Sequence, residues 1–292
     1  MANIDQLYLL GPVQVQRNGQ LVRGIASRKT FALLGYLAAR AQPASRSHIA
    51  DLFWPDLSEA RGRANLSGVL HNLAAVVPGC LTADRQLVAF QPSPTVWVDI
   101  AAFETLAAQG TPDALAAAVQ LYRDDFMGDL FLDDCPDFEI WLAQRREEWC
   151  MRAVEVLQVL INTHADRGED AKAIAFLRRW LALEPLCETA HCQLMDLLAR
   201  AGHRSAALAQ YEAFQRLLAA ELRAEPAAQT RALYERLRAG EIGVASKIGV
   251  ATRIGLASEI GDAGTADGAA WVPQDRLLHR LGRHPNISVE VQ

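Results

Sequence analysis

The sequence predicts a mainly α-helical protein with a small β component, in which a head of helices and β-hairpins precedes a body of repeated helix pairs. Three observations support this fold class. In the first hundred positions, two short helical segments and a longer one lie between stretches of β-forming residues. Residues 99–240 follow a helical pattern almost throughout and carry a 34-residue internal period. A chain of 292 residues is also long enough for two hydrophobic cores.

A small sheet is expected at the start of the chain. Residues 7–15 are rich in β-forming side chains. Asn18 and Gly19 then favour the two-residue turn of a hairpin, with residues 21–22 on the returning strand.

Two short helices follow this sheet. The first is expected over residues 29–41, where apolar residues lie on one face. Ser45 is the expected N-cap of the second helix. The apolar residues that this second helix buries are Ile49, Leu52 and Phe53.

The longest helix of the head is expected over residues 56–77, where Asp56 and Glu59 have the spacing of a capping box. Its apolar face consists of Leu66, Leu70, Leu73 and Val77. The opposite face has no acid after Glu59, and it combines small residues with donors that suit phosphates and base edges. That face carries Arg61, Ala64, Asn65, Gly68, His71 and Asn72, with Arg63 and Ser67 at its borders. The alternative interpretation is a half-buried helix with a weakly polar outer side.

A β-hairpin comes after this helix. Residues 81–90 alternate as two short strands around a polar tip at Asp84 and Arg85, and residues 96–98 form another strand. Asp99 is expected to cap the next helix. This order is typical of a winged helix-turn-helix, in which a hairpin follows three helices and the third helix has a donor-rich face. In that fold the third helix enters the major groove of DNA, and Arg85 lies near the backbone or minor groove; a solvated turn residue is its alternative role.

The body carries helix pairs that repeat every 34 residues. Small residues at close-packed positions and glycine at the turn are typical of tetratricopeptide repeats, in which each pair covers the apolar face of its neighbour. Helices over residues 112–164 are expected to complete the stack. The acidic stretch at 124–137 is expected to form a polar loop, because its acidic residues do not have the spacing of an EF-hand calcium site. The paired positions are Leu160 and Leu194, Ala165 and Ala199, Gly168 and Gly202, Ala173 and Ala207, Ala175 and Ala209, and Leu177 and Tyr211.

These patterns divide the chain into three parts. A winged-helix domain is expected at 1–98, a tetratricopeptide-like domain at 99–240 and a poorly ordered tail at 241–292. The tail begins with three similar six-residue segments, IGVASK, IGVATR and IGLASE. They indicate a low-complexity linker, with one coil of a hexapeptide β-helix as the alternative.

Charge and composition narrow the function classes. Residues 1–100 have a net charge of +3 although the whole chain has −5, and a basic head on an acidic body suits a DNA-binding protein. We expect a cytoplasmic protein without a membrane span, because the sequence has neither a long uncharged apolar run nor a secretory signal. The five cysteines show no C-x-x-C motif and are expected to be reduced. A metal site at Cys187, His191 and Cys192 is the alternative.

Several ordered motifs closely resemble the SARP-type bacterial transcriptional activators (antibiotic-regulatory proteins). They include RKTFALLGYLA, SRSHIADLFWPD, ARGRANLSGVLHNL and LALEPLCETAHCQLMDLLARAGHRSAALAQYE, and the resemblance covers residues 5–240. It implies an OmpR-like winged helix joined to a tetratricopeptide-like bacterial transcriptional activator domain. It also implies binding to direct repeats near promoters, often as a homodimer, and contact with the sigma factor of RNA polymerase. The recognition-helix pattern of the family falls on Arg61, Arg63, Asn65, Ser67, His71 and Asn72.

The sequence departs from the family in two places. Ala74 and Ala75 stand where family members commonly carry a basic pair, which weakens phosphate anchoring. Many long members continue into an ATPase module, but no G-x-x-x-x-G-K-[ST] motif occurs here. We therefore expect the chain to bind neither ATP nor any other cofactor or metal.

We expect a non-enzymatic transcriptional activator that binds double-stranded DNA and contacts RNA polymerase. Arg28, Lys29 and Arg46, near helix starts, are expected to contact phosphates. The alternative is a protein-interaction scaffold that uses the helical repeats without binding DNA. An enzyme is disfavoured, because no nucleophile–base pair or ligand cluster is visible. The full set of expected DNA-binding residues is Arg61, Arg63, Asn65, Ser67, His71, Asn72, Arg28, Lys29, Arg46 and Arg85.

Overall fold

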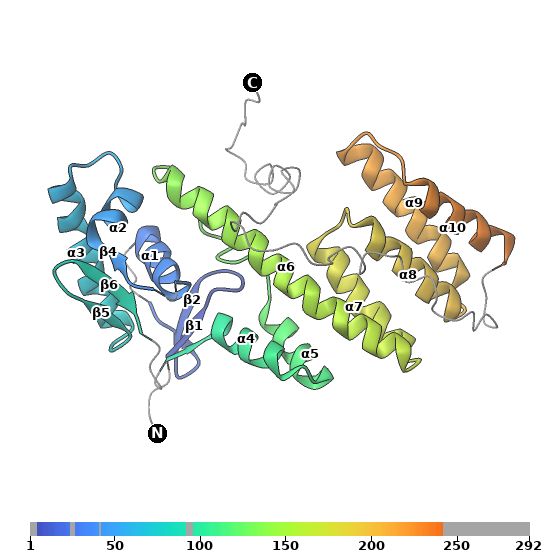
Figure 1. The fold of residues 1–292 in the computed structure, drawn as a ribbon, viewed down its shortest axis with the longest axis horizontal. Coiled ribbons are helices and arrows are strands. Elements are labelled where there is room, and N and C mark those ends of the chain that lie inside the picture. The colour runs from blue at the N-terminus through green and yellow to red at the C-terminus, as the bar shows by residue number, and fades with distance from the viewer. Residues whose placement is uncertain (1–4, 24–26, 41, 92–95, 242–292) are drawn as a thin grey trace, which may run out of the picture. The chain divides into compact units, whose positions relative to one another are not determined.

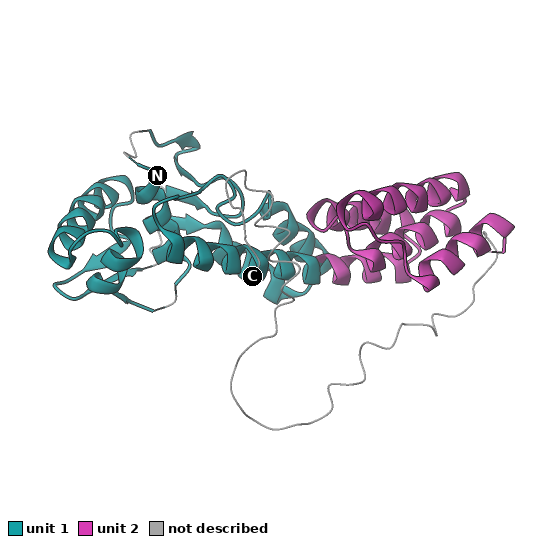
Figure 2. Cartoon of the chain, turned by 90° about the horizontal axis from the view of Figure 1, so that it is seen from above, with its two compact units in different colours: residues 1–156, 277–292 teal, residues 157–276 magenta. Residues whose placement is uncertain are grey.

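The computed structural model describes residues 5–23, 27–40, 42–91 and 96–241. These residues form ten helices and seven strands, so the protein is mainly α-helical with small sheets near its N-terminus, as predicted (Figure 1). They group into two compact units that divide between Val156 and Leu157, within one long helix (Figure 2). The expected tail lies outside the described residues from residue 242 on, and this includes the repeated hexapeptides at 242–259.

The first unit opens with a four-stranded sheet in the order β3-β2-β1-β7. Its strands are β1 (Asp5–Tyr8), β2 (Gln14–Arg17), β3 (Gln20–Leu21) and β7 (Val96–Val98). β1 pairs antiparallel with β2 and parallel with β7. Asn18 and Gly19 have φ angles of 52° and 76°, so the predicted two-residue turn, with both φ values positive, is confirmed.

Three helices follow: α1 (Arg28–Ala38), α2 (Arg46–Phe53) and α3 (Glu59–Val76). The predicted cap of α2 is confirmed, since Ser45 Oγ accepts a hydrogen bond from His48 N at 3.1 Å. The predicted capping box at the start of α3 is wrong. Leu57 N donates to Trp54 O in a turn that precedes the helix, so α3 begins only after Ser58. Glu59 instead accepts from Ser47 Oγ at 2.9 Å, which ties α3 to α2.

The predicted hairpin forms a second sheet with a third strand that the sequence pattern did not indicate. β5 (Leu81–Ala83) and β6 (Leu87–Phe90) pair antiparallel, and β4 (Ala44–Ser45) pairs with the other edge of β6. β4 directly precedes α2, so the hairpin is anchored to the start of that helix. Three helices with this hairpin form the predicted winged helix-turn-helix, and β5 and β6 are its wing.

Helices beyond residue 98 belong to the same compact unit. They are α4 (Asp99–Gln109), α5 (Pro112–Leu121) and the first part of α6 (Pro136–Asp166). Aromatic rings join α6 to the head: the ring centroids of Tyr36 and Trp141 lie 4.7 Å apart, and those of Phe53 and Phe138 lie 4.9 Å apart. Edge-to-face and tilted ring pairs of this kind add packing energy beyond the buried area.

Asp99 has a different role from the helix cap that the sequence suggested. It is the first residue of α4, and its buried carboxylate accepts hydrogen bonds from Leu9 N at 2.8 Å and Leu10 N at 2.8 Å. Burial raises the pKa of Asp99 to about 6, although these hydrogen bonds and the guanidinium of Arg123, 4.0 Å away, oppose the shift. Asp99 therefore ties the residues after β1 to the start of α4.

The second unit contains α7 (Asp170–Leu183), α8 (Glu188–Arg200), α9 (Arg204–Glu221) and α10 (Ala228–Ala239), which lie side by side (Figure 1). Gly168 and Gly202 have left-handed φ angles of 71° and 82°. Gly168 N donates to Ala165 O and Gly202 N to Ala199 O, each at 3.0 Å. The turn between the helices of each pair is thus the same at both positions, which agrees with the predicted 34-residue period.

Two other expectations concern metal sites. The acidic stretch forms a loop as expected up to α6, but its last residue, Asp137, lies in the first turn of that helix. In the loop, Asp129 Oδ1 accepts from Val13 N at 3.1 Å. His191 is held by Pro185 O and Gln210 Nε2 at 2.9 and 2.7 Å, and its ring stacks on Phe214. Within the described ranges, no group of three or more His, Cys, Asp or Glu side chains is arranged to bind a metal.

Candidate nucleic-acid interface

The outer face of α3 is exposed, and its inner face is buried as predicted. Leu66, Leu73 and Val77 are fully buried and Leu70 is 8% exposed. A Cβ atom built on Gly68 meets nothing within 4 Å, so the helix backbone is open to close approach at this position. The exposed residues around Gly68 are Arg61, Ala64, Asn65, Ser67, His71 and Asn72. This face is exposed in the described part of its own unit and combines donors with small side chains.

Arg46 lies at the junction of β4, α2 and the wing. Its backbone N–H donates to Gln86 O at 2.8 Å. Its guanidinium donates to Ser67 Oγ on α3 at 2.6 Å and to Asp84 O at the tip of the wing at 3.3 Å. Arg46 is therefore close to the α3 face, as its expected role requires, but it bonds to protein groups there.

Arg63 makes a second connection between α3 and the wing. Its Nη2 donates to Arg85 O at 2.9 Å, and its Nη1 lies 3.6 Å from Glu59 Oε1. Ser67 Oγ in turn donates to Arg63 O at 2.9 Å. Because Glu59 faces a guanidinium, the acid at the start of α3 is partly neutralised.

The tip of the wing is ordered by Asp84. Its Oδ1 accepts from Leu87 N at 2.7 Å and from Gln86 N at 2.6 Å. These backbone hydrogen bonds hold the pKa of Asp84 below its usual value. The fixed turn leaves Arg85 exposed at the tip.

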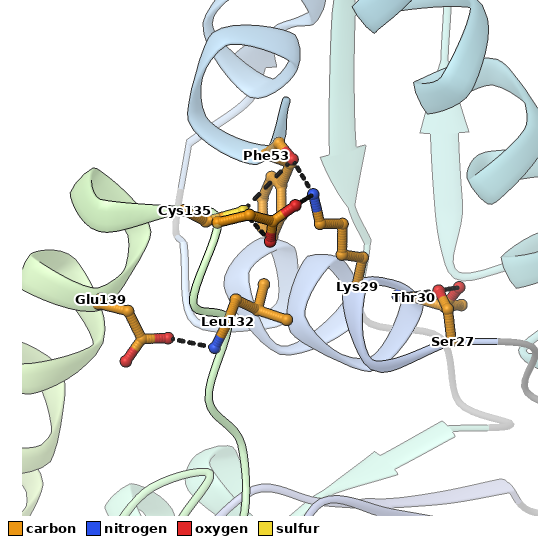
Figure 3. A network of polar contacts seen from close by, with 8 residues as sticks. Ser27, Lys29, Thr30, Phe53, Leu132, Cys135 and Glu139 are labelled. Carbon is orange, nitrogen blue, oxygen red and sulfur yellow. Dashed lines mark hydrogen bonds and ion pairs between the residues drawn. The ribbon is translucent and has the colours of Figure 1, made fainter. Parts of the chain in front are cut away.

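The two basic residues at the start of α1 lie in different surroundings. Arg28 is exposed, but Lys29 donates from Nζ to Phe53 O at 2.6 Å and to Asp134 Oδ2 at 2.6 Å (Figure 3). Cys135 Sγ donates to the same Phe53 carbonyl at 3.3 Å. Lys29 thus caps the carboxyl end of α2 and is bonded within the protein, in contrast to the free phosphate donor that the sequence suggested.

The role of Arg17 as a positioning residue was not predicted from the sequence. Arg17 makes a two-pronged contact with Asp5, at 2.7 and 2.8 Å, and its Nη2 also donates to Val76 O at the end of α3 at 2.8 Å. Asp5 and Arg17 are direct partners in the β1–β2 register, but the turn predicted at Asn18 and Gly19 joins β2 to β3 and does not indicate that pairing. The contact with Val76 could not be inferred, because it joins residues 59 positions apart.

Comparison with known proteins defines the class. Residues 98–238 match the family described as the bacterial transcriptional activator domain. The chain thus joins a winged helix-turn-helix to the helical domain of bacterial transcriptional activators. Among the described helices, none is both long and apolar enough to cross a bilayer.

Two curated regulators are similar over most of the chain. AfsR of Streptomyces coelicolor is 25% identical over 237 residues, which are 78% of this chain and 24% of AfsR. DnrI of Streptomyces peucetius is 26% identical over 264 residues, which are 82% of this chain and 94% of DnrI. The chain therefore spans about a quarter of AfsR and nearly all of DnrI. Together with the domain match, these relatives confirm the resemblance of the chain to the SARP-type regulators.

A solved structure supports the fold. EmbR of Mycobacterium tuberculosis, in complex with a low-affinity phosphopeptide, has a TM-score of 0.61 and 22% identity, over 82% of this chain and 66% of that one. At this identity the likeness concerns the fold alone.

Proposed function

We propose that the protein is a sequence-specific DNA-binding transcriptional activator. The observation that carries this proposal is the exposed, donor-rich face of α3 in a winged helix-turn-helix, whose third helix enters the major groove in known complexes. The family match and the two regulatory relatives support the same class of function. Such a protein works in the cytoplasm, where bacterial DNA lies.

Different residues of the surface suit different parts of the duplex. Arg61 and Asn65 can make two-pronged contacts with guanine and adenine, and His71 and Asn72 add donors further along the same face. Gly68, without a side chain, lets the helix backbone come close to the base edges. Arg85 at the wing tip and Arg28 at the start of α1 are the exposed cations for phosphates.

The helical domain is proposed to contact RNA polymerase through its sigma factor, and two copies of the chain to bind neighbouring promoter repeats. Both statements rest on the resemblance of the chain to the SARP-type regulators. Stacked helix pairs present extended surfaces that suit protein partners, which supports a role of this domain in recruitment.

The direct test is DNA binding by the purified chain. A library of random duplexes should yield an enriched operator, and footprinting should locate it upstream of promoters. Several phosphate contacts predict that the affinity falls by at least about a hundredfold between roughly 50 and 200 mM salt. A chain that binds no duplex at the lower salt concentration would contradict the proposal and favour the scaffold function.

A further inference from the structure

Two arginines from different helices hold successive carbonyl groups of the wing tip. Arg46, at the start of α2, donates to Asp84 O at 3.3 Å. Arg63, on α3, donates to Arg85 O at 2.9 Å. Ser67 joins the two, because its hydroxyl accepts from Arg46 at 2.6 Å and donates to Arg63 O at 2.9 Å. We call Arg46, Arg63 and Ser67 the wing clamp.

The wing clamp acts on a turn that is already fixed internally. Asp84 Oδ1 accepts the N–H groups of Gln86 and Leu87, and Asp84 N donates to Leu87 O at 3.0 Å. The turn is therefore a rigid element, and the clamp sets its position against α3. At the end of this element the side chain of Arg85 remains exposed.

We propose that Arg46 and Arg63 are positioning residues, which orient Arg85 on the wing toward a DNA phosphate. This inference rests on the proposed DNA binding. Exposed polar contacts add little to folding stability. Substitutions in the wing clamp should therefore change the affinity for DNA much more than the free energy of unfolding. Its benefit is preorganisation, because a wing that is ordered before binding loses less conformational entropy in the complex.

The donors of α3 thus fall into two groups. Arg63 and Ser67, on the side of the wing, serve the clamp. Arg61, Asn65, His71 and Asn72 carry no clamp contact and remain for the bases. This differs from the sequence-based expectation, in which all six residues belong to one DNA-contacting set.

The test is a double-mutant cycle between Arg46→Ala and Arg85→Ala, with the salt dependence of operator binding as the readout. A lost phosphate contact lowers the slope of log K against log salt by about 0.9. Each single variant should lower the slope by that amount, and the double variant should lower it no further, since Arg46 acts only through Arg85. A double variant that lowers the slope by about 1.8 would overturn the inference, because Arg46 would then hold a phosphate of its own.

A second measurement needs no DNA. Backbone NMR relaxation of the free chain should show faster motion at residues 84–86 in Arg46→Ala than in the wild type, and Arg46→Lys should restore part of the order. Arg216→Ala, an exposed arginine on α9, removes the same charge and should leave both readouts unchanged. Unchanged motion at the wing in Arg46→Ala would overturn the clamp even if the operator is bound. Failure of the wild type to bind any duplex would overturn the proposed function and, with it, the role of the clamp in binding.

Discussion

The ammonium group of Lys29 lies 2.6 Å from the carbonyl oxygen of Phe53 and caps the carboxyl end of α2 from the first turn of α1. Asp134 completes the site as the ionic partner of Lys29. A cation at the carboxyl end of a helix also interacts favourably with the helix dipole. The contact holds the two short helices of the head in register, and only 19% of the Lys29 side chain remains exposed.

We predict that Lys29→Met lowers the free energy of unfolding by about 1–2 kcal/mol, because a charged hydrogen-bond donor is removed from a mostly buried carbonyl. Urea denaturation gives this difference. The salt slope of operator binding should match that of the wild type at temperatures where both are folded. A reduced slope with unchanged stability would show that Lys29 contacts a phosphate after all.

Arg61→Ala and Asn65→Ala should each remove about 1–3 kcal/mol of discrimination between the operator and single-base variants, if they contact bases. Competition binding against a set of substituted operators measures this. Arg216→Ala is the charge-matched control for Arg61→Ala. Equal weakening on every duplex would assign the changed residue to the DNA backbone.

Gly68→Ala separates stability from binding. Alanine in place of a helical glycine should stabilise α3 by about 0.5–1 kcal/mol, and the new methyl group has open space around it. In the proposed complex the same methyl group would lie between the helix and the base edges, so operator affinity should fall. Thermal unfolding and binding titrations of one preparation give both numbers. A variant that is more stable and binds equally well would exclude close backbone approach at Gly68.

Gly168→Ala should destabilise the second unit by about 1 kcal/mol, because φ is 71° and a side chain there is strained. A Cβ atom would meet nothing within 4 Å, so backbone strain is the whole effect. Denaturation monitored by circular dichroism tests this prediction. Gly168→Asn should lose less stability than Gly168→Ala, because asparagine tolerates the left-handed region better than alanine does. Equal losses for alanine and asparagine would contradict this explanation.

Asp99 predicts a specific dependence of stability on pH. Its pKa in the folded chain is about 6, above the ordinary value of 3.8, so the folded state holds this proton more tightly than the unfolded state does. The stability that Asp99 contributes is therefore complete below about pH 4 and is lost as the pH rises through about 6, by at most about 3 kcal/mol.

Asp99→Asn cannot ionise and serves as the reference for that measurement. Urea titration gives the unfolding free energies of the wild type and of Asp99→Asn. From pH 4 to 7 the wild type should lose stability relative to Asp99→Asn. A difference that stays constant over this range would mean that the carboxylate is already charged at pH 4.

Local patterns in the sequence predicted much of the fold. The buried face of α3, the cap at Ser45 and the glycine turns at Gly168 and Gly202 each depend on residues within a few positions of one another. Helical period, capping chemistry and turn preference are properties of such short segments. For the same reason, the exposed residues of the candidate DNA surface could be named in advance.

Long-range partners could not be predicted in this way. Asp99 bonds to backbone groups 89 and 90 positions earlier, and Lys29 pairs with a residue 105 positions later. Both were assigned local or external roles from sequence, as a helix cap and a phosphate contact. A charged side chain takes whichever partner the tertiary fold brings near, and that choice leaves no trace in the local pattern.

The recurrence of one turn geometry at Gly168 and Gly202 bears on how such a domain can change in length. Equivalent hydrogen bonds 34 residues apart mean that the two helices of one pair are joined by much the same turn as those of the next pair. Duplication or loss of a whole pair would leave the turn inside every remaining pair intact. Descendants of this chain could therefore lengthen or shorten their helical half by gene-level copying of one helix pair, without redesigning the winged helix-turn-helix.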